Sequence, residues 1–231
     1  MLEWLYPTRC PVCEKPVLPK GAMIHSLCEN RLPVLSEPFC KKCGKPLASE
    51  DEEYCPVCMV KNRVWDGGRS VYRYQNTAGS MIRKVKRDGT ETILVFLAKQ
   101  MKSHCRSFLL ETGAECIVPV PLHWTKQQKR GFNQAELLAR ALGKELGIPV
   151  KNLLQKTKHT KDQKYMSLEQ RSRNVADVYC IRKDKKSAVM PQAVLLIDDI
   201  VTTGSTLTAC AGVLKESGVK QVYFITVCAG E

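Results

Sequence analysis

The 231-residue sequence has no apolar run that approaches the roughly 20 residues needed to cross a bilayer. Its first residues, Met-Leu-Glu-Trp-Leu-Tyr-Pro, lack the charged start and the apolar core of a secretion signal. Acidic residues are scarce, because 23 Asp and Glu stand against 36 Lys and Arg, for a formal net charge of +13. We therefore expect a cytoplasmic protein that does not insert into a membrane and whose partners are anions, either phosphorylated metabolites or nucleic acid.

Three nucleotide- and DNA-binding patterns are also missing from the sequence. No Gly-Lys-[Ser/Thr] follows a glycine at the interval of a Walker loop, and no Gly-x-Gly-x-x-Gly of a dinucleotide site occurs. No helix-turn-helix pattern is visible either. These absences exclude the common loop-type nucleotide sites and leave little support for a regulator of duplex DNA.

Cysteine, by contrast, is abundant, with twelve residues in the chain. Seven of them fall before residue 60, mostly in Cys-x-x-Cys pairs, which in a chain without an export signal favours metal binding over disulfides. The pairs Cys40/Cys43 and Cys55/Cys58 are separated by eleven residues. Four thiolates at this spacing predict a tetrahedral structural zinc site, which stabilises a module too small to fold around a core of its own.

A weaker copy of this pattern lies thirty residues upstream. Shifting the sequence by thirty places aligns Cys10, Cys13, His25 and Cys28 with the four zinc ligands and predicts a second four-ligand site. A competing alignment places Cys28 opposite Cys55 and Arg31 opposite the last cysteine, and on that alignment the second site is broken. The sequence leaves both alternatives open.

The stretch Val194–Thr206 carries the clearest chemistry. Four apolar residues predict a buried strand, two carboxylates (Asp198 and Asp199) follow at its expected end, and the hydroxyl-rich run Thr202-Thr203-Gly204-Ser205-Thr206 precedes a helix. The N-terminus of a helix binds phosphate through its free N–H groups and its dipole. The carboxylates suit the 2′- and 3′-hydroxyls of a ribose, with or without magnesium. The stretch therefore predicts a site for a sugar that carries a 5′-phosphate.

The remaining elements alternate between strands and helices. We expect an α/β fold in which a parallel sheet is flanked by helices, preceded by a cysteine-rich zinc-binding module at 1–62, with the main domain at 63–231. Strands are predicted at 71–74, 116–118 and 221–227, helices at 81–86, 92–108, 134–146 and 207–217, and a polar, basic loop at 125–133.

Three groups of basic residues are candidates for contacts with nucleic acid: Arg83, Lys84, Lys86 and Arg87; Lys126 and Lys129; and Arg171 and Arg173. A solvated surface explains the first group equally well.

Residues 194–206 resemble the phosphoribosyl pyrophosphate (PRPP) motif of type I phosphoribosyltransferases. With Pro119-Val-Pro-Leu122, Arg130-Gly-Phe-Asn-Gln134 and Arg171-Ser-Arg-Asn-Val175, the chain resembles the ComF family of competence proteins along almost its whole length. The resemblance implies a zinc finger joined to a phosphoribosyltransferase-type domain. It also implies a role in natural transformation, in which the protein handles incoming single-stranded DNA beside the DNA-uptake helicase and channel proteins.

The resemblance also implies roles for individual residues. Asp198 and Asp199 would hold the ribose of PRPP, and residues 202–206 its 5′-phosphate. Pro119, Val120 and Pro121 would form the pyrophosphate loop, and residues 126–130 a flexible flap. If transfer occurs, magnesium together with Arg130 and Arg171 would stabilise the departing pyrophosphate, so Asp198, Asp199 and Arg130 are the candidate catalytic residues.

One position weakens a purine-salvage function, and two functional hypotheses are left. Purine-salvage phosphoribosyltransferases resemble this motif but carry an aspartate where this chain has Thr202, and no segment here reads as a hood over a nucleobase. The first hypothesis is a competence-type protein that binds PRPP and single-stranded DNA. The second is an active phosphoribosyltransferase, of the glycosyltransferase class, that acts on a small nitrogenous acceptor.

Overall fold

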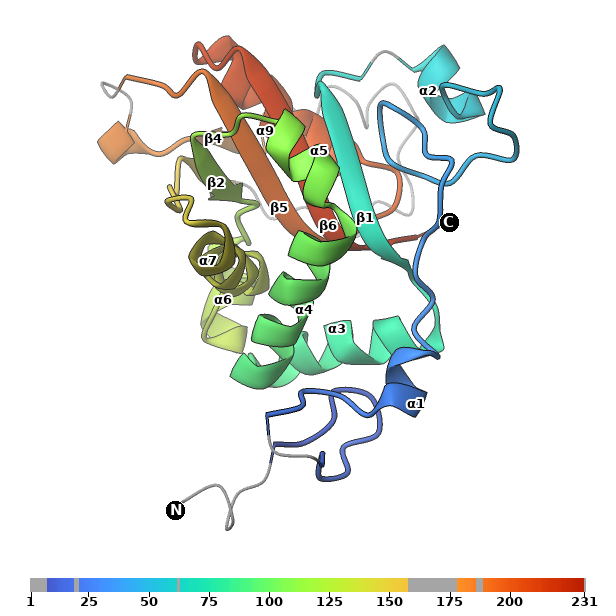
Figure 1. Cartoon of the computed structure of the whole chain (residues 1–231). Coiled ribbons are helices and arrows are strands. Elements are labelled where there is room, and N and C mark those ends of the chain that lie inside the picture. The colour runs from blue at the N-terminus through green and yellow to red at the C-terminus, as the bar shows by residue number, and fades with distance from the viewer. Residues whose placement is uncertain (1–7, 19–20, 62, 158–177, 186–188, 231) are drawn as a thin grey trace, which may run out of the picture.

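A parallel four-stranded sheet forms the centre of the molecule (Figure 1). The computed structural model describes residues 8–18, 21–61, 63–157, 178–185 and 189–230. The sheet has the order β1 (Gly67–Arg73), β6 (Gln221–Ala229), β5 (Ala193–Val201) and β2 (Cys116–Pro119), and all three pairings are parallel. A second, antiparallel pair consists of β3 (Leu154–Lys156) and β4 (Tyr179–Ile181). The predicted parallel α/β sheet is confirmed.

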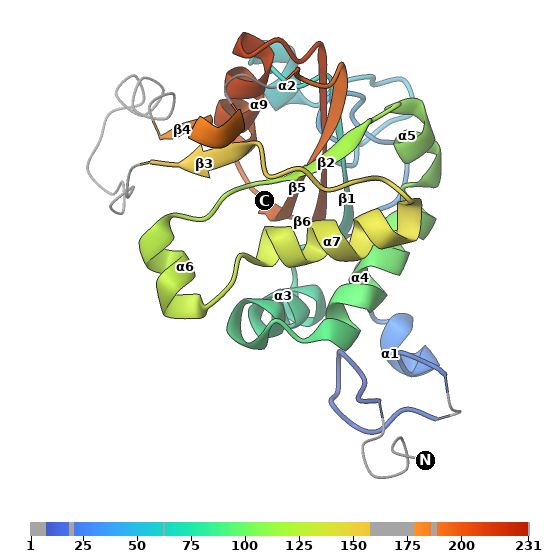
Figure 2. The same ribbon diagram turned by 90° about the vertical axis from the view of Figure 1, so that its left-hand side faces the viewer.

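Helices cover both faces of this sheet (Figure 2). On one face lie α3 (Asn76–Asp88), α4 (Glu91–His104) and α7 (Gln134–Leu146), and on the other α9 (Ser205–Glu216) and the β3–β4 pair. The shorter helices are α1 (Ser26–Glu29), α2 (Pro56–Val60), α5 (Arg106–Glu111) and α6 (Trp124–Arg130), with a 3-10 turn at Lys183–Lys185. None of the helices within the described ranges has the length and hydropathy needed to cross a bilayer.

The central strand β5 explains why both faces must be covered. Its apolar residues are fully buried, with Leu195 and Ile197 in the core beneath α3, α4 and α7, and Val194 and Leu196 in the core beneath α9. Side chains alternate between the faces of a strand, so a continuous apolar run serves both cores at once. The carboxyl ends of β5 and β2 meet at one edge of the sheet, where the candidate site lies.

The two halves of the cysteine-rich region pack on different parts of the domain (Figure 1). The first ribbon, comprising residues 8–18 and 21–30, lies against α3, where Lys84 Nζ donates a hydrogen bond to the Pro11 carbonyl oxygen at 3.2 Å. The second ribbon, residues 36–61, lies beside β1, where the indole N–H of Trp65 donates to the carbonyl oxygen of Lys42 at 3.0 Å. Each ribbon therefore has its own contact with the domain.

Two sequence predictions are wrong in detail. The helix expected at 92–108 is two helices, α4 and α5, separated at Cys105. The loop expected at 125–133 contains α6, whose N-terminus is capped by His123, because the imidazole Nδ1 accepts a hydrogen bond from the Thr125 N–H at 3.3 Å. Gly131 ends this helix in the left-handed conformation, with φ of 83°, which glycine adopts without strain.

Candidate functional site

The two carboxylates of the motif lie within β5, and the prediction that the strand ends before them is wrong. Strand pairing continues past both acids, with Asp198 opposite Thr226 and Val201 opposite Ala229 of β6. Because successive side chains of a strand point to opposite faces, Asp198 lies on the α9 face and Asp199 on the α3 face. The two acids are therefore not equivalent.

Asp199 is buried, at 3% exposed, and faces a lysine. Lys86 Nζ of α3 lies 2.6 Å from Asp199 Oδ2, which makes a close ion pair. Beyond this ion pair, Oδ2 has no hydrogen-bond partner among the described residues. Lys86 thus neutralises a carboxylate that would otherwise be costly to bury.

Asp198 is held at the edge of the hydroxyl-rich loop. Burial of its carboxyl group raises the pKa of Asp198 well above its usual value, and the neighbouring charge of Asp199 raises it further. The backbone N–H of Asp199 donates to Asp198 Oδ1 at 2.8 Å, which opposes this shift in part. Asp198 therefore has a raised pKa, and perturbed pKa values of this kind are common at functional sites.

Residues 202–206, which we call the phosphate loop, follow β5 and lead into α9. Residues 198 and 200–207 line a hollow of about 40 Å³. Gly204 is the N-cap of α9 and adopts φ of 75°. Thr203 and Ser205 hydroxyls lie 2.9 Å apart, and the Thr203 hydroxyl accepts from the Ser205 N–H at 3.3 Å. The loop thus gathers hydroxyls and free helix N–H groups around a space close to the size of a phosphate group.

The predicted pyrophosphate loop lies beside this hollow. The Val120 N–H donates to the carbonyl oxygen of Ile197 at 3.0 Å, so residues 119–121 run next to Asp198. The Asn133 side chain, which is buried, donates to the Val120 carbonyl oxygen at 3.0 Å and fixes the loop from the α7 side. Beyond this loop lies a groove of about 590 Å³, and Pro119, Trp124, Lys156 and Lys183 are among the residues that line it.

The basic candidates are distributed over two helices. On α3, Lys84 pairs with Glu14 at 2.7 Å, Lys86 pairs with Asp199, and Arg87 pairs with Asp88 at 2.7 Å, while Arg83 is exposed. The second group lies on α6, close to the groove.

On α6, Lys126 and Lys129 are exposed and Trp124 is 59% exposed. Arg130, a candidate catalytic residue, donates a hydrogen bond to the Gln134 side chain. Arg171 and Arg173 lie outside the described residues. The structure thus brings Asp198, the phosphate loop and residues 119–121 together, and it directs Asp199 to the other face of the sheet.

The second ribbon brings the Cys40, Cys43, Cys55 and Cys58 sulfurs within 4.8 Å of one another. The Cys43 and Cys55 sulfurs are 3.7 Å apart, close to the separation of about 3.8 Å that a tetrahedral zinc with Zn–S bonds of about 2.3 Å requires. Burial raises the pKa of Cys40, but backbone hydrogen bonds outweigh it and lower that pKa to about 7. These four residues fit a zinc ion.

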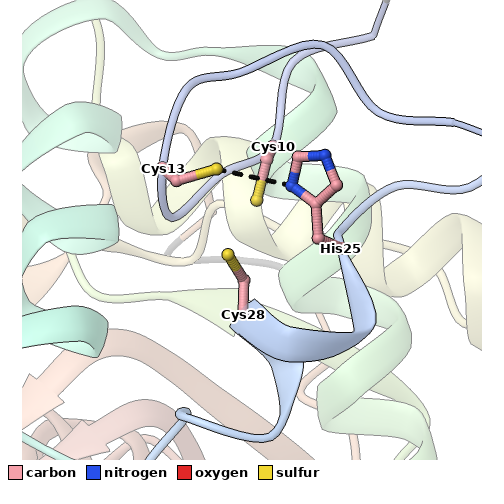
Figure 3. A group of neighbouring side chains, drawn as sticks. All are labelled: Cys10, Cys13, His25 and Cys28. Atoms are coloured by element: carbon pink, nitrogen blue, oxygen red, sulfur yellow. Dashed lines mark hydrogen bonds between the residues drawn. The ribbon is translucent and has the colours of Figure 1, made fainter.

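The first ribbon gathers Cys10, Cys13, His25 and Cys28 in the same way (Figure 3). All four ligand atoms lie within 4.8 Å of one another, and Cys13 Sγ is 3.4 Å from His25 Nδ1. The other ring nitrogen, Nε2, lies 2.9 Å from the Pro16 carbonyl oxygen, an outer contact that orients a ligating imidazole. The geometry favours the alignment with a thirty-residue shift over the alternative that substitutes Arg31.

Two family models match separate parts of the chain. The double zinc ribbon domain matches residues 1–59, and the phosphoribosyl transferase domain matches residues 128–231. The protein is therefore a double zinc ribbon joined to a domain of the phosphoribosyltransferase type.

Curated relatives share this organisation over most of their length. Competence protein F of Haemophilus influenzae is 30% identical over 196 residues, which cover 82% of this chain and 83% of that protein. The DNA utilization protein YhgH of Escherichia coli is 26% identical and matches 96% of this chain and 97% of its own. Competence protein ComFC of Bacillus subtilis is 29% identical over 83% of this chain and 77% of its own. The chain belongs to the ComF family of competence proteins.

Two residues near the site carry no signal in the sequence. Arg63 and Trp65, which follow the second ribbon, contact the phosphate loop although they lie about 140 residues before it in the chain. They belong to no motif, and only packing between distant segments places them here.

Proposed function

We propose that this protein binds phosphoribosyl pyrophosphate with magnesium at Asp198 and the phosphate loop, and binds single-stranded DNA during DNA uptake. The observation that carries the first part is the hollow at the N-terminus of α9, lined by Asp198 and residues 202–206, with the backbone of Val120 hydrogen-bonded to Ile197 next to Asp198. Binding of PRPP to the purified protein, lost when magnesium is chelated, is the direct test.

Each part of the ligand has a matching partner in this arrangement. The 5′-phosphate would accept hydrogen bonds from the N–H groups and hydroxyls of the phosphate loop. The ribose hydroxyls would donate to Asp198, and the pyrophosphate would lie along residues 119–121. A magnesium ion would supply charge neutralisation for the pyrophosphate oxygens, with oxygen ligands of the kind Asp198 offers.

The DNA-binding part of the proposal depends on α6. This helix carries three exposed side chains, Trp124, Lys126 and Lys129. An exposed aromatic ring on the same short helix as two cations suits single-stranded nucleic acid, because bases stack on the ring while cations contact phosphates. By family membership, the partners on this pathway would be the helicase and channel proteins of DNA uptake in the cytoplasm.

Replacing Lys126 and Lys129 with alanine is expected to weaken single-stranded DNA binding and to reduce its salt dependence. Each phosphate contact contributes about 0.7 to the slope of log K against log salt, so losing two lowers the slope by about 1.4. Fluorescence anisotropy with a labelled oligonucleotide measures both effects. Lys99 and Lys144, exposed lysines of α4 and α7, are the matched control pair and should leave the slope unchanged. If the wild-type protein binds no single-stranded DNA at low salt, this part of the proposal is wrong.

An active phosphoribosyltransferase is the second candidate, and one observation favours it. The groove of about 590 Å³ beside residues 119–122 is large enough for a small nitrogenous acceptor next to the ribose position. This hypothesis predicts magnesium-dependent release of pyrophosphate when acceptors are screened. Binding of PRPP without pyrophosphate release for any acceptor supports the first candidate.

A further inference from the structure

The segment that follows the second ribbon touches the phosphate loop directly. The indole ring of Trp65 lies so close to Gly204 that a Cβ at this position would be 2.6 Å from Trp65 Cη2. No side chain other than hydrogen fits at that distance, and φ of 75° also favours glycine. Trp65, which follows the second ribbon in the chain, therefore forms one wall of the phosphate loop at Gly204.

The loop between the zinc ligands Cys40 and Cys43 holds Trp65 in this position. Lys42, which lies between the ligands Cys40 and Cys43, accepts the hydrogen bond of the indole N–H at 3.0 Å. The ring also meets Phe224 of β6 edge to face, with centroids 5.2 Å apart. Trp65 is 1% exposed, so it has little freedom to move. Trp65 thus connects the loop between the zinc ligands Cys40 and Cys43 with the phosphate loop.

The Arg63 side chain lies over the Trp65 ring, and one of its N–H groups lacks a hydrogen-bond acceptor among the described residues. Its guanidinium carbon is 4.9 Å from the Trp65 ring centroid, and Nη1 is 3.4 Å from the position that a Gly204 Cβ would occupy. The Arg63 Nε is buried and has no hydrogen-bond partner within the described residues. A buried N–H of a cation without an acceptor is costly, so the arrangement is expected to be completed by an anion.

A cavity at this contact is open to such an anion. Its volume is about 230 Å³, and it is lined on one side by the second ribbon, including the zinc ligands Cys43, Cys55 and Cys58, and on the other by residues 201–204. Three cationic side chains, Lys45, Lys61 and Arg63, line it, and none of them has an ion pair among the parts of the chain that the structure describes. Thr202 and Thr203 belong to both this cavity and the hollow of the phosphate loop.

We propose that Arg63 is a phosphate-binding residue, and that it supplies a cation, from the segment that follows the second ribbon, to the phosphate group held by the phosphate loop. The inference rests on the proposed function, since the loop must first hold a phosphate. Arginine suits the role because its planar fork donates two parallel hydrogen bonds to phosphate oxygens. The segment that follows the second ribbon then forms one wall of the ligand site, and the ribbon holds this segment in place through the hydrogen bond between Trp65 and Lys42.

The test compares two ligands that carry the 5′-phosphate with a third that lacks it. Arg63→Met, which keeps the apolar stem against Trp65 and removes the charge, is expected to weaken binding of PRPP and of ribose 5-phosphate by about tenfold to a hundredfold. Binding of magnesium pyrophosphate, which lacks the 5′-phosphate, should change by less than about twofold. Arg63→Lys should restore part of the affinity, because it keeps the charge without the fork. Calorimetric titration measures each dissociation constant.

Arg106→Ala is the matched control, since Arg106 is an exposed arginine of α5 outside the described cavities. Unchanged ribose 5-phosphate binding by Arg63→Met, in a wild-type background that binds PRPP, overturns the role of Arg63 alone. A parallel loss of all three ligands with a lower unfolding temperature also overturns it, because that pattern indicates a purely structural residue. Failure of the wild-type protein to bind PRPP overturns the proposed function, and this inference with it.

Discussion

Replacing Asp198 with asparagine is expected to weaken PRPP binding by about tenfold to a hundredfold while increasing the stability of the folded protein. The first effect follows because ribose hydroxyls lose a charged acceptor, and such a hydrogen bond contributes about 1.5–3 kcal/mol. The second follows because burial and the charge of Asp199 raise the pKa of Asp198, so its ionised form is unfavourable in the fold. Asparagine keeps the acceptor for the Asp199 N–H and removes the charge.

The stability gain depends on pH in a defined direction. A carboxyl group whose pKa is higher in the folded state than in the unfolded state binds more protons when folded. Its contribution to stability is present at low pH and is lost as the pH rises through the folded pKa. The stability difference between Asp198→Asn and the wild type should therefore be larger at pH 8 than at pH 5 in urea denaturation.

Asp88→Asn is the matched control for this experiment. Asp88 is an exposed carboxylate of α3 that pairs with Arg87, and this pairing lowers the pKa of Asp88. The control should leave PRPP binding unchanged and should not stabilise the protein. Wild-type PRPP affinity in Asp198→Asn would remove Asp198 from the site, whatever its effect on stability.

Removal of zinc is expected to have the largest effect on stability. Both ribbons are small, and their four-ligand clusters are the main links between distant parts of each segment. Structural zinc contributes about 10–16 kcal/mol of apparent binding free energy in zinc-finger peptides, so a ribbon that loses its ion unfolds. A strong chelator should lower the unfolding temperature and release two zinc ions per chain, which a metal-release assay measures.

Single-ligand variants separate the two clusters. His25→Ala is expected to reduce zinc content from two ions to one by disrupting the first cluster, and Cys58→Ser to do so by disrupting the second. Arg31→Ala is the control, because Arg31 lies outside both clusters and should leave two ions bound. One zinc per wild-type chain would contradict the second site and would favour the alignment in which Arg31 replaces a ligand.

Local signals in the sequence define much of this fold. The helix at 134–146 has the predicted bounds because Asn133 caps its start and Gly147 ends it in the left-handed conformation. The helix α6 is not predicted because Trp124 is followed by six polar and basic residues, which show no apolar periodicity. Its start is fixed instead by the His123 imidazole, which accepts a hydrogen bond from the Thr125 N–H. Histidine is not one of the usual N-cap residues, so the sequence does not reveal this start.

Part of the candidate site can likewise be predicted from the sequence, and part of it cannot. The phosphate loop is visible in the sequence because hydroxyls and glycine between a strand and a helix have a direct chemical meaning. The separation of Asp198 from Asp199 is not visible, because it depends on the pairing of β5 with β6 beyond the acids. Arg63 and Trp65 are equally invisible, since the segment that follows the second ribbon meets the loop only in the folded chain. Motifs therefore predict the ligand, and packing determines which neighbours complete its site.

Calorimetric titration of PRPP in the presence of magnesium, repeated after saturation with single-stranded DNA, tests the central claim most directly. The proposed function predicts one PRPP bound per chain, a requirement for magnesium, and a measurable dissociation constant in both titrations. The second titration also shows whether DNA changes the affinity, and any such change must be reciprocal. Absence of binding at millimolar PRPP with magnesium, from a protein that is folded and holds its zinc, would contradict the account.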